Sequence, residues 1–101
     1  MIVYNVTTMV ATGKVEEWLE WMRKTHIPEI MATGCFNGFR MLRLLEVDDA
    51  EGQTYAVQYH CTERVDYERY NSLFAHALRE TAMSVWGEDA VSFRTLMEVI
   101  N

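Results

Sequence analysis

Two histidines are the side chains of this chain best suited to acid–base chemistry. His26 stands at the end of a helical pattern, and His60 lies in a strand-like segment beside Gln58. An imidazole can remove a proton near neutral pH because its ordinary pKa lies in that range. Each also has a structural alternative: His26 could bind a free carbonyl at the helix end, and His60 could be an edge residue near solvent. Both are candidate bases, and no other catalytic residue is assigned.

Four polar residues and one tryptophan are candidates for ligand binding. They are Asn5, Arg40, Gln58, Arg94 and Trp21. The polar four belong to one predicted sheet face, where the two arginines could hold a carboxylate or a phenolate. The alternative is structural, with Arg94 paired to Glu98 or arginine–glutamate contacts across a dimer. Trp21 lies about 120° off the apolar stripe of its helix, so we expect it at the lip of a pocket or in a subunit contact.

The sequence has no motif for a metal ion or a cofactor. It lacks two-histidine–carboxylate spacing, a glycine-rich phosphate loop and a nucleophile elbow. Cys35 and Cys61 have neither CxxC nor zinc-finger spacing and are expected to be reduced, structural thiols. His76 and Glu80 are one helical turn apart, so we expect His76 to face water and pair with Glu80. We therefore expect neither a metal nor a cofactor.

Length and charge limit the classes of function. The chain has 101 residues, 50% of them hydrophobic, and a formal net charge of -6. A single domain over residues 1–101 is expected. Because negative charge repels phosphate backbones and anionic membrane surfaces, neither nucleic acid nor a membrane is an expected partner. No apolar run reaches the ~18 residues of a membrane span and no leader pattern is present, so we expect a cytoplasmic protein.

The residue pattern predicts alternating strands and helices. Strands are expected over residues 2–10, 35–47, 53–62 and 89–100, and helices over residues 14–26, 28–33 and 62–86. The first two helices should be separated at Pro28, since proline disfavours helical geometry in the preceding residue. The last helix is expected to bury the stripe of Tyr70, Leu73, Phe74, Ala77, Leu78, Thr81 and Val85. This order predicts an α+β, ferredoxin-like βαββαβ fold, with a four-stranded antiparallel sheet and both helical stretches on one face.

One face of the sheet would then lack helices. We place Tyr4, Val6, Val57 and Phe93 toward the helices and Asn5, Thr7, Gln58, His60, Ser92, Arg94 and Glu98, with Arg40, on the bare face. The bare face would also carry apolar side chains, and a large apolar patch requires cover. We therefore expect a homodimer joined through the sheet faces. The faces of the 35–47 strand stay open, because a bulge near Gly38 would exchange them.

Several segments carry a resemblance to a known family. They read IVYNV, EEWLEWM, HIPEIMATGCF, RMLRLLE, TYAVQY, DYERY and FRTLMEV, and they span almost the whole chain. Together they resemble an uncharacterised family of short bacterial proteins, a domain of unknown function within the dimeric α–β barrel superfamily. The resemblance implies the ferredoxin-like fold and a barrel shared by two chains. It implies no activity, since wider relatives include cofactor-free monooxygenases, haem-degrading enzymes, stress-responsive barrels and sugar mutarotases.

Three functions remain open from the sequence. The leading hypothesis is a cytoplasmic homodimer that binds a small molecule between sheet and helices. The first alternative is a cofactor-free monooxygenase or isomerase, in which His26 or His60 removes a proton while Arg40 or Arg94 stabilises the anion. The second alternative is a purely structural dimer whose barrel is filled by side chains. Whether the chain is an enzyme is left undecided by its residues.

Overall fold

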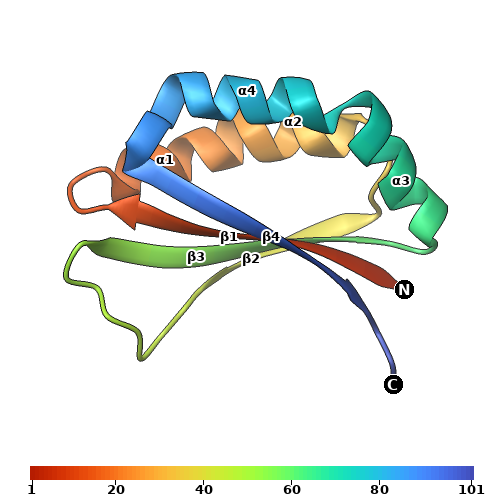
Figure 1. Cartoon of the computed structure of the whole chain (residues 1–101), viewed down its shortest axis with the longest axis horizontal. Coiled ribbons are helices and arrows are strands. Elements are labelled where there is room, and N and C mark those ends of the chain that lie inside the picture. The colour runs from red at the N-terminus through yellow and green to blue at the C-terminus, as the bar shows by residue number, and fades with distance from the viewer.

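A four-stranded antiparallel sheet carries every helix on one face, as the computed structural model of all 101 residues shows (Figure 1). The strands are β1 (Ile2–Ala11), β2 (Gly38–Arg43), β3 (Gly52–Cys61) and β4 (Ala90–Glu98), in the spatial order β2-β3-β1-β4. The helical segments are α1 (Val15–Trp21), the π-helical η1 (Met22–His26), α2 (Ile27–Ala32), α3 (Arg64–Leu73), α4 (Ala75–Trp86) and the short η2 (Gly87–Asp89). The predicted α+β, ferredoxin-like order is confirmed.

The first helical stretch does not break at Pro28 as expected. Backbone angles stay helical through His26 and Ile27, and the Ile27 N–H donates to the Met22 carbonyl, the spacing of a π-helix. Pro28 then follows directly in the first turn of α2. The helix is therefore irregular one turn before the proline. It widens into a π-helical turn there and does not end.

The second helical stretch does break, at Phe74. The N-cap of α3 is Glu63, which forms a capping box with Asp66. The predicted apolar stripe is wrong on both sides of this break, since Leu73 is 67% exposed and Val85 is 51% exposed. Leu78 of the stripe does contact the core, together with Ala75 and Trp86 of α4.

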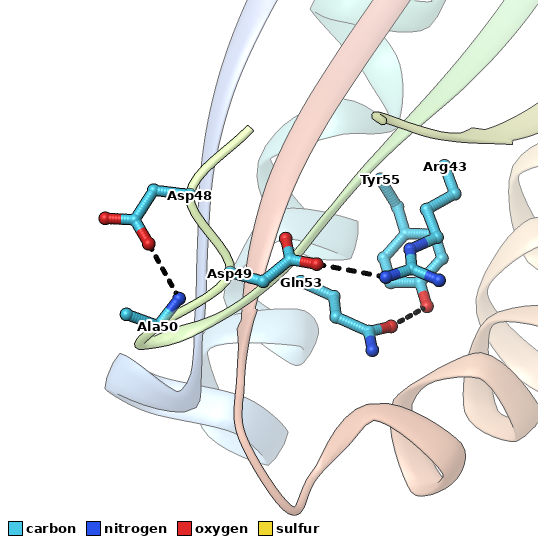
Figure 2. Close-up of polar contacts among 6 residues, drawn as sticks. All are labelled: Arg43, Asp48, Asp49, Ala50, Gln53 and Tyr55. Atoms are coloured by element: carbon cyan, nitrogen blue, oxygen red, sulfur yellow. Dashed lines mark hydrogen bonds and ion pairs between the residues drawn. The ribbon is translucent and has the colours of Figure 1, made fainter. Parts of the chain in front are cut away.

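The β2–β3 hairpin is shorter than the sequence suggested. Strand β2 covers only Gly38–Arg43 of the expected 35–47, and the loop that follows is held by polar contacts (Figure 2). Arg43 Nη2 lies 3.0 Å from Asp49 Oδ2, and the Ala50 N–H donates to Asp48 Oδ1 at 2.9 Å. These contacts stabilise the turn between the two strands.

Alternation along the central strand β1 separates two chemically different faces. Tyr4 and Val6 face the helices, opposite Tyr59 and Val57 of β3. Val6 is also opposite Arg94 of β4, so Arg94 points toward the helices. The face expected for β4 is therefore wrong: Ser92, Arg94, Leu96 and Glu98 lie on the helix side, and Phe93 lies on the bare face. The reason is that this edge strand is more apolar on its uncovered side than on its covered one.

The helix-covered face contains an aromatic core. Tyr4 packs against Phe36, Tyr59 and Tyr70, with ring centroids 6.0, 6.1 and 5.6 Å away. Cys35 and Cys61 are buried, unpaired thiols beside this cluster, as expected for small apolar side chains. None of the helices is long and apolar enough to cross a bilayer. The rigid core leaves one concave region on the same face, between β4 and the helices.

Candidate functional site

A pocket opens between the helix-covered face of the sheet and the two helical stretches. Its volume is about 400 Å³, and 15 of its 22 lining residues are hydrophobic. The floor comes from β1, β3 and β4, and the walls come from α1, η1 and α4. The polar or aromatic lining residues used below are Tyr4, Trp21, His26, Tyr59, Tyr70, Arg79, Trp86, Glu88 and Arg94. The size and the apolar lining are those of a small-molecule site.

The π-helical turn places His26 in the wall of this pocket. Its imidazole stacks on Trp21, with ring centroids 4.6 Å apart and planes 16° from parallel. Burial, with a smaller contribution from the nearby positive charge of Arg94, lowers the pKa of His26 from 6.5 to about 4. At neutral pH the ring is therefore uncharged and can accept a proton or a hydrogen bond. It does not lock a helix end through a carbonyl, which was the structural alternative.

Two indoles form the aromatic part of the wall. Trp21 is half-buried and lies at the pocket, as expected for a lip residue. Trp86, at the end of α4, meets it edge to face at a centroid distance of 5.8 Å and an angle of 70°. The Trp86 Nε1–H is buried and has no acceptor within the chain. A flat molecule could lie against the indole surface that lines the pocket.

Two arginines supply positive charge to the pocket. The Arg79 Nη2 donates to the Tyr4 hydroxyl at 3.0 Å, while its Nε–H is buried without an acceptor. Arg94 enters from β4, and neither arginine takes part in an ion pair. Burial raises the pKa of Tyr59 and of Tyr70 above the ordinary range, so both phenols stay neutral. The only carboxylate in the lining belongs to the exposed Glu88.

The remaining predicted site residues lie on the opposite, bare face. Arg40, Gln58 and Asn5 stand directly opposite one another across β2, β3 and β1. Asn5 Nδ2 donates to Thr7 Oγ1 at 2.9 Å, whereas Asn5 Oδ1 and His60 Nδ1 are buried without partners. The face of β2 that the sequence left open is thereby assigned, since Arg40 shares the bare face with Gln58.

The structure thus divides the predicted site residues into two groups. His26, Trp21 and Arg94 meet in the pocket, whereas His60, Asn5, Arg40 and Gln58 line the other side of the sheet. Of the predicted bases and arginines, only His26 and Arg94 line this pocket, which also contains Arg79. Arg94 is therefore not part of the barrel-facing polar set in which the sequence placed it.

His76 has no role in either group. Its Nε2 lies 2.9 Å from Glu80 Oε1, and the side chain is 89% exposed, which confirms the expected surface pair. No three His, Cys, Asp or Glu side chains gather in a group that could hold a metal ion.

Sequence reasoning missed Arg79 and Trp86. Both residues fell outside the predicted apolar stripe, because the prediction continued a single stripe through the break at Phe74. Restarting the helical phase at Ala75 places Leu78, Arg79, Ala82 and Trp86 on one face, three to four residues apart. The sequence signal that could have identified them is an arginine and a tryptophan on the same helix face as buried residues.

The sequence matches a known family over residues 1–100: DUF4286, a domain of unknown function. The chain belongs to this family. No curated protein matches it.

Solved structures share the fold at low sequence identity. An ethyl tert-butyl ether d (ethd) family protein from Bacillus halodurans superposes with a TM-score of 0.69 at 13% identity, covering 99% of this chain and 100% of the other. A variant of SnoaB, a cofactor-independent oxygenase from Streptomyces nogalater, gives 0.69 at 16% identity, with 99% and 94% covered. A dimeric ferredoxin-like protein from an uncultured marine organism gives 0.69 at 16%, with 99% and 96% covered. At these identities the likeness shows the fold alone.

The lowered pKa of His26 predicts a pH-dependent stability. In the folded chain the pKa is about 4, against 6.5 when exposed, so the unfolded state takes up the proton first as pH falls. The fold is therefore most stable above pH 6.5 as far as His26 is concerned, and about 3 kcal/mol of stability is lost as the pH falls from 6.5 to 4. Urea unfolding of His26→Gln should show a correspondingly flatter pH profile than the wild type.

The exposed histidine gives the matched control. His76→Gln removes an imidazole that is 89% exposed, so its profile should follow the wild type. If the free energy of unfolding of His26→Gln fell toward acid pH as steeply as that of the wild type, the assignment of a neutral, buried imidazole would be wrong.

Proposed function

We propose that this chain binds a small planar organic molecule in the pocket between sheet and helices. The supporting observation is a cavity of about 400 Å³ whose lining combines the indoles of Trp21 and Trp86 with His26 and two arginines. A flat ligand would stack on the indoles and place its polar groups at the imidazole and the guanidinium groups. A purely structural chain would have filled this space with side chains.

The functional unit that we propose is a homodimer formed through the bare sheet faces. That face exposes Val91, Phe93 and Met9, at 56, 63 and 40%. A contiguous apolar surface of this kind is stabilised when another protein surface packs on it and removes it from water. A second copy is the favoured partner because solved structures of this fold are described as dimeric ferredoxin-like proteins. Each copy would keep its own pocket, since the pocket lies on the other side of the sheet.

A second candidate function is cofactor-free proton abstraction. It rests on one observation, the His26 imidazole and the Arg94 guanidinium lining the same pocket; the lowered pKa leaves the imidazole free to take a proton and makes it a weaker base. The imidazole would take a proton from an acidic C–H bond of the ligand, and the electron pair would move onto a carbonyl oxygen facing Arg94. One solved structure of the same fold is a cofactor-independent oxygenase, which makes this chemistry compatible with the scaffold.

Filling the pocket should abolish binding of a planar probe. Ala82 lines the pocket from α4, so Ala82→Phe should prevent binding of β-naphthol, which the wild type binds in isothermal titration calorimetry. Ala77 lies on the exposed side of the same helix, and Ala77→Phe should bind like the wild type. Absence of β-naphthol binding to the wild type, or equal binding by both variants, would refute the pocket proposal.

A charge on the bare sheet face should separate the dimer. Phe93→Lys is expected to shift the mass measured by light scattering to that of one chain, because a desolvated ammonium in the interface is costly. Leu73→Lys changes a residue of similar exposure, 67% against 63%, on the helical side and should stay dimeric. A dimeric Phe93→Lys, or a monomeric wild type, contradicts an interface through the bare face.

The proton-abstraction candidate predicts isotope exchange. The wild type should accelerate exchange of the acidic C–H protons of β-tetralone in heavy water, observed by nuclear magnetic resonance. His26→Gln should reduce the rate to that of buffer at an unchanged binding enthalpy for β-naphthol. His60→Gln, on the other face of the sheet, is the control and should exchange like the wild type. Equal rates in His26→Gln and the wild type would exclude His26 as the base.

A further inference from the structure

The mouth of the pocket lies at the sheet edge formed by β4. Most lining residues are buried or half-buried, and the exposed ones belong to the end of α4, to η2 and to the first half of β4: Met83, Glu88, Val91, Ser92 and Arg94. Val91 also belongs to the bare face, because it is opposite Met9. The mouth of the pocket and the surface proposed for dimer formation therefore meet along this one strand.

The β2–β3 loop, residues 44–51, carries apolar side chains away from the sheet. Leu45 is 74% exposed and Val47 is 43% exposed, and the loop extends from the sheet on the side opposite the helices (Figure 1). Between them Glu46 has a φ of 57°, a left-handed conformation that is unfavourable for a residue other than glycine. The contact of Arg43 with Asp49 holds the base of the loop (Figure 2). Apolar side chains presented in a fixed loop favour contact with another surface.

The loop and the mouth of the pocket lie at the same end of the sheet and at opposite edges. The two edge strands are β2 and β4, in the order β2-β3-β1-β4. The start of β3 at Gly52 is opposite Ala11, and the start of β4 at Ala90 is opposite the adjacent Val10. Three strand spacings, about 14 Å, separate the two edges. No residue of the loop lines the pocket of its own chain.

A two-fold axis parallel to the strands brings the loop of one copy to the mouth of the other. Sheets that pack face to face through equivalent surfaces have their axis in the plane between them. With the axis along the strands, Leu42 lies over the partner's Phe93, and Arg40 lies over the partner's Thr95. An axis across the strands would set Arg40 against its equivalent, where like charges repel, or against apolar side chains. The chemistry of the bare face therefore favours the axis along the strands.

From this geometry we infer that the β2–β3 loop of each copy closes the pocket of its partner. Leu44 still pairs with Thr54, in the row of the sheet that ends at Val91, so it lies over the partner's Val91. Leu45 and Val47 continue the chain beyond this row and cover the mouth with apolar surface. The inference rests on the proposed function, since it needs both the pocket and the dimer. It adds that neither pocket is complete in a single chain.

Disulfide cross-linking tests the contact directly. Leu45→Cys/Val91→Cys should give a covalent dimer on a non-reducing gel after mild oxidation with copper phenanthroline. A link within one chain is excluded, because the edges are about 14 Å apart and a disulfide needs Cα atoms within ~7 Å. Leu45→Cys/Leu73→Cys places the second thiol on the helical side, at 67% exposure against 56% for Val91, and should run as one chain. No covalent dimer in the first variant, or an equal yield in both, would overturn the inference.

Removing the apolar side chains of the loop should speed ligand release. Leu45→Ser/Val47→Ser should release β-naphthol at least about threefold faster than the wild type, because a closing segment acts mainly on the dissociation rate. Stopped-flow fluorescence of β-naphthol measures the rate, and light scattering should show an unchanged dimer, since the sheet faces are intact. Leu73→Ser is the control and should release like the wild type. Equal rates for the loop variant and the wild type contradict a loop that closes the pocket.

These outcomes can be separated from those of the proposed function. A dimeric wild type that binds β-naphthol, with no cross-link in Leu45→Cys/Val91→Cys, refutes only the loop contact. A monomeric wild type refutes the dimer proposal, and absence of β-naphthol binding to the wild type refutes the pocket proposal. Either of these two results refutes the present inference as well.

Discussion

The strict alternation of side chains along β1 determines the chemistry of the whole molecule. This strand is central, paired with β3 on one side and with β4 on the other. Because successive residues of a strand point to opposite faces, the register assigns every neighbour as well. Arg94 joins the pocket because it is opposite Val6, and Gln58 joins the bare face because it is opposite Asn5. A pocket and an apolar surface for assembly are thus separated by the thickness of one sheet.

Helical irregularities bring functional side chains into the pocket that this sheet supports. The widened turn over residues 22–26 lets His26 stack on Trp21 in the wall, and the break at Phe74 sets the phase of α4. Both features depart from regular α-helix beside the cavity. Departures of this kind frequently occur at functional sites, which agrees with the position of the neutral imidazole and of the two indoles.

Much of the fold could be predicted because strands and helices differ in the period of their apolar residues. The order of elements and the pairing of His76 with Glu80 followed directly. The face of β4 that packs on the helices could not be predicted. Phe93 lies on the uncovered side of this edge strand, so the local pattern of apolar residues does not show which side faces the helices. Arg79 and Trp86 were also missed, because the helix break at Phe74 has no proline or glycine to mark it. Both failures arise from tertiary contacts that a local pattern does not contain.

The π-helical turn makes the site sensitive to chain length. A π-type hydrogen bond spans one residue more than an α-helical one, so this turn accommodates the equivalent of a single inserted residue. Removing one residue from the 22–26 segment would restore a regular helix and rotate everything before it by about 100° relative to α2. Trp21 and His26 would then no longer face each other. Within the family, chains that differ by one residue in this segment would share the fold and differ in the pocket.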